Sequence, residues 1–160
     1  MRNLATLMLL IGGCASLPDQ QLSFSAREYR QYGRLDDVAR AAPTMCDVPV
    51  NRPRVSASRD EATHGRKLYY LFAKDRSAYL HARDFDQPDG QVVVKESWLR
   101  DEAGAKGPLF MMMKERGEWT YATASPDGAT IAASGKLASC IECHESASTR
   151  DRMFGVTTRR

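Results

Sequence analysis

Five residues near the C-terminal end, Cys140-Ile141-Glu142-Cys143-His144, constrain this chain more than any other feature of its sequence. On one turn of helix, two thiols three residues apart face the same side, and the next residue directs its imidazole toward the same neighbourhood. In this pattern two thiolates add to the vinyl groups of haem, and the histidine then lies beneath the iron. We therefore expect Cys140 and Cys143 to attach haem c and His144 to be an axial ligand of the iron.

Three other interpretations of the motif are weaker. A zinc site needs about two more ligands, and Cys46, His64 and His81 have no paired spacing. A redox dithiol of the thioredoxin type follows an early strand, whereas this motif lies late in the chain. A structural disulfide suits an exported protein but leaves His144 unexplained. The spacing favours haem over all three.

The N-terminus has the pattern of a targeting segment. Arg2 gives a positive start, and the apolar run 4–11 is too short to span roughly 30 Å of hydrocarbon as a helix. The small residues Gly12 and Gly13 before Cys14 resemble a bacterial lipobox. We predict a lipoprotein-type signal peptide over residues 1–13 and a lipid-modified Cys14. The chain would then face the periplasm as a membrane-anchored lipoprotein; the alternative is a plain signal peptide with an incidental cysteine.

Length and charge limit the number of domains and the kinds of partner that the chain can have. At 160 residues with a formal net charge of +3, the chain has room for one modest domain. Basic and acidic residues alternate throughout, which excludes a stripe for nucleic-acid phosphates. We expect a tether over residues 14–24 and a single domain over 25–160. Cys46 is left over, and we interpret it as a buried small hydrophobe, with a free or intermolecular thiol as the alternative.

The chain pattern predicts an α+β fold, a mainly antiparallel sheet with an N-terminal helix and a C-terminal haem-bearing helix. Aromatic and β-branched runs separated by turn signals indicate strands, and alternation predicts apolar residues on both faces of the sheet. The expected strands are 66–73, 91–99, 108–114 and 118–124; the expected helices are 25–40, 75–83 and 136–149, with an extended loop over 41–64.

The position of the motif separates classes of cytochrome. Small electron carriers place it near the N-terminus and supply a methionine ligand later. Here Met153 follows His144 too closely for that role, and the run Met111 to Met113 is more typical of core packing. A four-helix cytochrome would need amphipathic helices across 66–124, where the pattern indicates strands. We expect an iron with an open sixth position.

Four segments in order resemble the cytochrome P-460 family, over about residues 62–155. In that family an antiparallel β-sheet domain carries the haem motif on a late helix. The segments are His64-Gly65-Arg66-Lys67-Leu68-Tyr69-Tyr70, Val92-Val93-Val94-Lys95-Glu96, the strand 108–114, and Cys140 to His144 followed by Asp151-Arg152-Met153-Phe154.

The resemblance implies one of two activities. Some members oxidise hydroxylamine and nitric oxide, with a strand lysine bonded covalently to the porphyrin, which by position would be Lys95. The cytochrome c′-β branch lacks that bond and binds nitric oxide or carbon monoxide beneath aromatic side chains. Lys95 could instead be an ordinary strand lysine. A homodimer is a further expectation from the family, and the sequence does not identify the electron-acceptor protein.

The distal side of the haem is the least constrained part of the site. Arg66 and Tyr70 are expected to reach a pocket there, and Phe72 and Phe110 to cap it. Alternation directs Glu96 away from Lys95, and Glu142 lies within the motif on the proximal side. No catalytic proton acceptor is assigned from the sequence.

Overall fold

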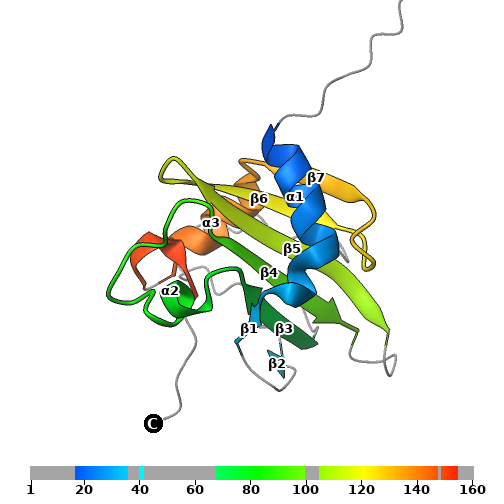
Figure 1. Cartoon of the computed structure of the whole chain (residues 1–160), viewed down its shortest axis with the longest axis horizontal. Helices are drawn as coiled ribbons and strands as arrows, with labels where there is room; N and C mark the ends of the chain where they lie inside the picture. Colours follow the sequence, from blue (N-terminus) through cyan, green and yellow to red (C-terminus); the bar gives the residue numbers. More distant parts are fainter. Residues whose placement is uncertain (1–16, 36–39, 42–67, 100–104, 148, 155–160) are drawn as a thin grey trace, which may run out of the picture.

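A single antiparallel sheet organises the described part of the chain. The computed structural model describes residues 17–35, 40–41, 68–99, 105–147 and 149–154 (Figure 1). Within these residues the sheet has seven strands in the order β1-β3-β4-β5-β6-β7, with β2 also paired to β3, and every pairing is antiparallel. The strands are β1 (Gly33–Arg34), β2 (Arg40–Ala41), β3 (Leu68–Ala73), β4 (Val92–Trp98), β5 (Lys106–Glu115), β6 (Glu118–Ala124) and β7 (Ile131–Gly135).

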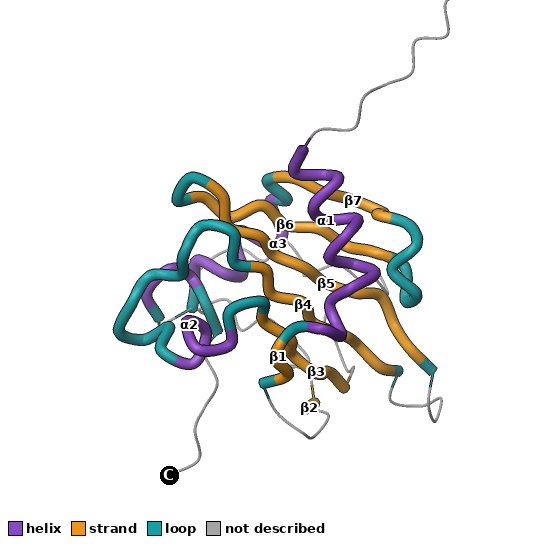
Figure 2. Tube along the Cα trace, in the orientation of Figure 1, coloured by secondary structure: helices purple, strands orange, loops and turns teal. Residues whose placement is uncertain are grey.

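Helices cover both faces of this sheet. The long helix α1 (Leu17–Glu28) crosses one face and leads into the short 3-10 helix η1 (Tyr29–Gln31). Behind the strands in the same view lies α3 (Ala138–Glu145), with α2 (Arg76–Leu80) and the 3-10 helix η2 (Arg150–Arg152) toward the same end of the molecule (Figures 1 and 2). The expected α+β class, with a mainly antiparallel sheet, is confirmed.

Strand alternation divides the core into two clusters, one on each face. The α1 face is filled by Leu22 and Ala26 of the helix packed on strand residues such as Val94, Leu109 and Met111. The opposite face, which we call the α3 face, joins Ala73, Val93, Met112, Trp119, Tyr121 and Met153, with Leu137, Cys140 and Ile141 packed against them. Because both faces are apolar and covered there, the central strands β4 and β5 carry buried residues at consecutive positions, as expected.

The N-terminal helix lies earlier than predicted. The bounds of the predicted helix 25–40 are wrong, because α1 begins at Leu17, helical conformation ends with η1 at Gln31, and Tyr32 and β1 are extended. Residues 17–24, predicted as part of a tether, instead form most of α1. Leu22, Ala26 and Tyr29 recur at spacings of four and three, which places them on one helix face against the sheet. The polar residues between them obscured this stripe.

The predicted strands in the middle of the chain are confirmed as β3 to β6, with β5 and β6 paired as a hairpin, and α2 lies within the predicted helix 75–83. Three strands were missed: β1 and β2, which are two residues long each, and β7. After Ile131, β7 consists of small residues, and it is mostly exposed, so its strand conformation depends on pairing with β6 rather than on a hydrophobic pattern. The loop predicted over 41–64 lies almost wholly outside the described residues.

The predicted signal peptide and Cys14 lie outside the described residues. Among the helices that the structure describes, none combines the length and hydrophobicity needed to cross a membrane.

Candidate haem-attachment site

The helix α3 carries all three residues of the attachment motif. It begins after Leu137 and holds Cys140, Cys143 and His144 within two turns. Leu137, Cys140 and Ile141 pack against the α3 face of the sheet, which fixes the helix beside β6. The motif therefore lies on a rigid element, with the sheet as its support.

The imidazole of His144 is held in a defined orientation. Its Nδ1 lies 2.8 Å from the backbone carbonyl oxygen of Arg152. Since a carbonyl oxygen can only accept, Nδ1 carries the proton and Nε2 is left with a free lone pair. The ring also lies between two aromatic residues, with centroid distances of 5.3 Å to Tyr121 and 5.1 Å to Phe154. A histidine whose other nitrogen donates to a carbonyl is the usual arrangement of a metal ligand.

Two effects keep His144 neutral. Burial lowers the pKa of its imidazole, and the positive charge of Lys95 lowers it further, against the opposing effect of the Arg152 carbonyl. Neutral imidazole is the form that binds a metal ion.

The two cysteines of the motif differ in state. Cys140 is a free, partly buried thiol, and burial raises the pKa of that thiol. Cys143 is disulfide-bonded. One sulfur cannot form a disulfide and a thioether together. Attachment of haem through both cysteines therefore requires that this disulfide be reduced first.

Tyr121 has a buried polar atom with no partner. Its side chain comes from β6, is 3% exposed and packs on His144. Among the described residues its hydroxyl makes no hydrogen bond, and burial raises its pKa to about 12. An unsatisfied buried hydroxyl is costly. A bound group with a polar edge on this face would satisfy it, so this observation fits a cofactor held beside α3.

Lys95 belongs to the same face as the motif. In the β4 register it lies opposite Leu71 of β3 and Phe110 of β5, and it alternates with Val93 of the α3-face cluster. Its Nζ is 4.2 Å from the ring centroid of Tyr69. Lys95 therefore lies on the same face of the sheet as His144, and Phe110 lies beside it on β5.

Two of the predicted distal residues are elsewhere. Phe72 and Tyr70 lie on the α1 face, because alternation along β3 directs Leu71 and Ala73 toward α3. Phe72 packs edge-on against Tyr29 with centroids 5.1 Å apart, and the ring of Tyr70 carries the guanidinium of Arg34 at 4.0 Å. Neither shares a site with His144. Arg66 lies outside the described residues.

Sequence reasoning missed the residues that surround His144. Tyr121 could have been found, because alternation from Trp119 along β6 places the two on one face. Tyr69 follows in the same way from Leu71. The contacts of Arg152 and Phe154 depend on how the chain turns back after α3, and no local pattern indicates that turn.

The methionines of the described residues are core side chains. Met111 and Met113 pack on the α1 face, and Met112 and Met153 on the α3 face, each no more than 5% exposed. Met153 follows Arg152, whose carbonyl binds the Nδ1 side of His144 and not the Nε2 side. Core packing describes all four, as the sequence indicated for Met111 to Met113.

Of the three residues considered as additional zinc ligands, only His81 is described. It lies exposed at the end of α2, and its Nδ1 contacts the carbonyl oxygen of Ser77 at 2.8 Å. Cys46 and His64 lie outside the described residues.

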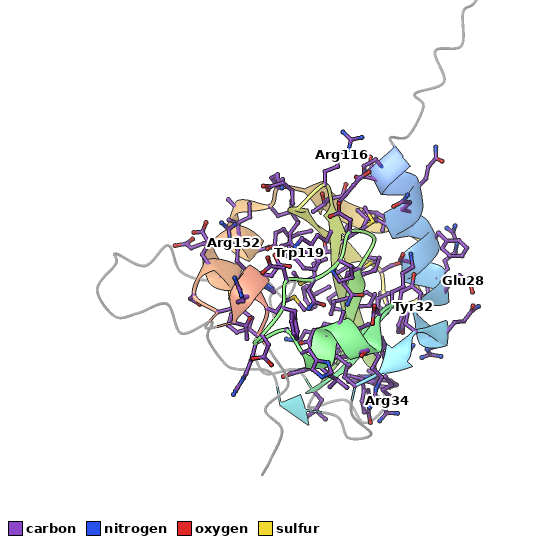
Figure 3. All side chains as sticks on the ribbon, turned by 60° about the vertical axis from the view of Figure 1, so that its left-hand side comes forward. Glu28, Tyr32, Arg34, Arg116, Trp119 and Arg152 are labelled. Atoms are coloured by element: carbon purple, nitrogen blue, oxygen red, sulfur yellow. The ribbon has the colours of Figure 1, made fainter. Side chains whose placement is uncertain are left out.

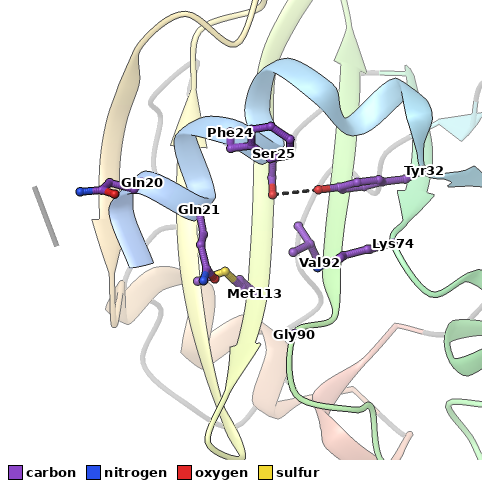
Figure 4. Close-up of a pocket in the computed structure, with 9 residues that line it drawn as sticks. All are labelled: Gln20, Gln21, Phe24, Ser25, Tyr32, Lys74, Gly90, Val92 and Met113. Atoms are coloured by element: carbon purple, nitrogen blue, oxygen red, sulfur yellow. Dashed lines mark hydrogen bonds between the residues drawn. The ribbon is translucent and has the colours of Figure 1, made fainter. Parts of the chain in front are cut away.

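A cleft of about 460 Å³ opens on the other side of the sheet (Figure 4). It lies between α1 and the strands, where Ser25 and Tyr32 share a hydrogen bond of 2.9 Å. Its floor includes Val92 and Met113 of the α1-face cluster. None of the predicted site residues lines it, so we separate it from the haem-attachment motif.

Comparison with protein-family models, curated proteins and solved structures finds no match to this chain.

Proposed function

We propose that this chain is an exported c-type haem protein of the cytochrome P-460 type, which oxidises hydroxylamine or nitric oxide at an open iron. The observation that carries the proposal is the state of His144: Nδ1 donates to the Arg152 carbonyl, and the Nε2 lone pair is left for a metal. The proposal rests on this geometry and on the Cys140–His144 motif, with the family resemblance as its guide to the reaction.

Bound haem would supply an iron site for a nitrogen ligand and a route for electrons to leave. The protein's part is to hold and orient it. Cys140 and Cys143 would form the two thioethers once both sulfurs are thiols, and His144 would bind the iron through Nε2. The contacts of Tyr121 and Phe154 with the imidazole ring would keep His144 in place to hold the haem.

Lys95 is the residue that decides between the family's two activities. In the enzyme, its amine would be consumed in a covalent bond to the porphyrin, which tunes the electronic properties of the macrocycle. Two observations support that role: Lys95 lies on the α3 face, and its positive charge lowers the pKa of His144. The Tyr69 ring under Nζ would hold the side chain until it reacts.

The second candidate function is gas binding without turnover, as in the cytochrome c′-β branch. It is favoured by the residues that flank Lys95 across the sheet, Leu71 and Phe110, which are both apolar. Oxidation of an N–O substrate needs a group that moves protons. Glu96 cannot be that group, since it lies on the α1 face in a separate cluster.

The electron-carrier alternative needs a second protein ligand to the iron. All four methionines of the described residues are packed in the core, which favours an open sixth position. Five-coordinate ferrous haem that binds carbon monoxide would support this, whereas a six-coordinate ferrous spectrum would favour the carrier.

Mass spectrometry of the full chain, produced with its export signal in a host that attaches haem c, tests the proposal. Trypsin should release a peptide of residues 137–150 carrying haem on both cysteines. If Lys95 is also joined to haem, cleavage after it is blocked and residues 84–100 remain linked to that peptide. Turnover of hydroxylamine should then accompany the linkage.

The same digest, analysed without reducing the disulfides, also shows the outcomes that would contradict the proposal. Haem on Cys140 and Cys143 with a free peptide 84–95 removes the enzyme proposal and leaves gas binding. Recovery of Cys143 in a disulfide peptide, with no haem attached, removes the haem proposal altogether.

A further inference from the structure

The turn that follows α3 adopts an unfavourable backbone conformation. Asp151 and Arg152 have φ angles of 63° and 60°, in the left-handed region that L-residues other than glycine avoid. Two such residues in succession persist only where the surrounding structure fixes them. The turn directs the Arg152 carbonyl onto Nδ1 of His144.

The side chain of Asp151 is the point at which the turn is fixed. Its Oδ2 accepts from Nζ of Lys114 at 2.5 Å and from the backbone N–H of Gln87 at 2.7 Å. Nε1 of Trp119 donates to the Asp151 backbone oxygen at 2.9 Å and lies 3.2 Å from Oδ1. These partners come from β5, β6 and the loop before β4, so one carboxylate ties the turn to three parts of the domain.

The residues that bind Asp151 are themselves buried or hydrogen-bonded to the rest of the domain. Lys114 is 6% exposed, so its ammonium depends on this carboxylate for its charge partner. Gln87 is buried, and its amide bridges the Ala78 carbonyl and the Gln91 side chain at 2.8 Å each. In Figure 3, Trp119 and Arg152 lie on the side of the molecule away from Glu28 and Tyr32.

We propose that Asp151 is a positioning residue for the proximal histidine. It holds the strained turn so that the Arg152 carbonyl keeps Nδ1 protonated, fixes the ring plane and strengthens donation from Nε2 to the iron. The inference rests on the proposed haem function and deepens it, because it assigns the control of axial ligand strength to a residue that touches neither haem nor iron. Second-shell groups of this kind commonly set ligand basicity.

The test uses the holoprotein and reads the iron–histidine bond directly. Resonance Raman spectroscopy of the ferrous, five-coordinate form gives the iron–His144 stretching frequency. Asp151→Ala should lower and broaden that band and raise the midpoint potential, because a weaker donor favours ferrous iron. Asp151→Asn retains an acceptor for the Gln87 N–H, so its band frequency and midpoint potential should lie between those of the wild type and of Asp151→Ala. The matched control is Asp127→Asn, an exposed turn carboxylate.

A purely structural role would give a different result. If Asp151→Ala lowers thermal stability while the band and the potential stay at wild-type values, the inference is wrong. Should that variant fail to fold, Lys114→Met removes only the charge partner of Asp151, and the same shift in the band is expected.

A separate measurement distinguishes failure of this inference from failure of the haem proposal. Nitrogen-15 NMR of the full chain without haem reports the tautomer of His144. Wild-type protein should show a protonated Nδ1, and Asp151→Ala should show a mixture of tautomers. If the chain carries no haem but this difference is observed, only the haem function is lost; if both proteins give the same tautomer signal, the positioning role is lost.

Discussion

Lys95 and Glu96 are consecutive residues of β4 whose side chains occupy opposite faces of the sheet. Glu96 is 3% exposed on the α1 face and accepts hydrogen bonds from four side chains, at 3.0 Å from Arg30 and 3.1 Å from Lys106. The other two donors are the Tyr29 hydroxyl and the Trp98 indole. A slip of one residue in register would exchange the two side chains. The Glu96 cluster therefore holds Lys95 toward α3.

Substitution of Lys95 tests the proposed cross-link. Lys95→Arg keeps the positive charge but removes the primary amine, so we expect trypsin to release residues 84–95 as a free peptide. The Soret band should return to the position of ordinary haem c, and hydroxylamine oxidation should fall to background while carbon monoxide still binds. Lys74→Arg, at an exposed lysine, is the matched control. An unchanged spectrum in Lys95→Arg would show that the lysine is not part of the chromophore.

Substitution of the proposed iron ligand should be reversible by a small molecule. In His144→Ala the thioethers still retain the haem, so the ferric absorption spectrum should change at full haem content. Added imidazole should restore it, because it can occupy the space that the side chain leaves. His81→Ala provides the control, as that histidine is exposed on α2. Equal spectra for wild-type and His144→Ala would exclude His144 as the ligand.

The sheet was predictable because its signals are local. Alternation in β4 correctly separated Lys95 from Glu96, and aromatic and β-branched runs between turn signals located β3 to β6. The error in the site came from choosing the wrong face: Phe72 and Tyr70 were grouped with the haem although their face belongs to α1. Alternation gives two faces but does not say which one a distant helix will cover.

The remaining features depend on long-range contacts. α1 is stabilised by the packing of Leu22 and Ala26 against the sheet. Its apolar residues are sparse within a polar segment, so the sequence pattern did not indicate where this helix begins. In the sequence, nothing distinguishes the role of Asp151 from that of the other charged residues near it. Its role becomes visible only when Lys114, Trp119 and Gln87 meet it from three other segments.

The Glu96 cluster predicts how stability depends on pH. Burial alone would raise the pKa of Glu96, but hydrogen bonds from Tyr29, Arg30, Lys106 and Trp98 outweigh it and hold the pKa below its usual value. A carboxylate with a lowered folded-state pKa stabilises the fold above its unfolded pKa, about 4.3, and loses that contribution as pH falls through the folded value.

Glu96→Gln should therefore cost about 1–3 kcal/mol of unfolding free energy at pH 7, and the difference from wild type should shrink below about pH 4. Urea denaturation across pH 3–7 measures this. Glu118→Gln is the control, because that carboxylate is exposed and its pair with Lys136 is a surface one. A constant difference between Glu96→Gln and wild type over the whole range would mean that the charge of Glu96 is not what stabilises the cluster.

The turn between β6 and β7 should tolerate no side chain at Gly128. Gly128 has a φ of +74°, and a Cβ added there would lie 2.0 Å from the carbonyl oxygen of Ala26 in α1. Gly117 has a similar φ of +77°, yet an added Cβ would meet nothing within 4 Å. Substitution by alanine carries the same conformational penalty at both glycines, about 1 kcal/mol. Only at Gly128 would the added Cβ also clash with backbone atoms.

We expect Gly117→Ala to cost about 1 kcal/mol of unfolding free energy and Gly128→Ala more than about 3 kcal/mol, because α1 must move away from the turn. Chemical denaturation of both variants measures the difference. Since Ala26 belongs to the α1 face and His144 to the other, the iron–histidine band of Gly128→Ala should stay at the wild-type frequency while the protein is folded. Equal costs for the two variants would show that α1 does not rest on this turn.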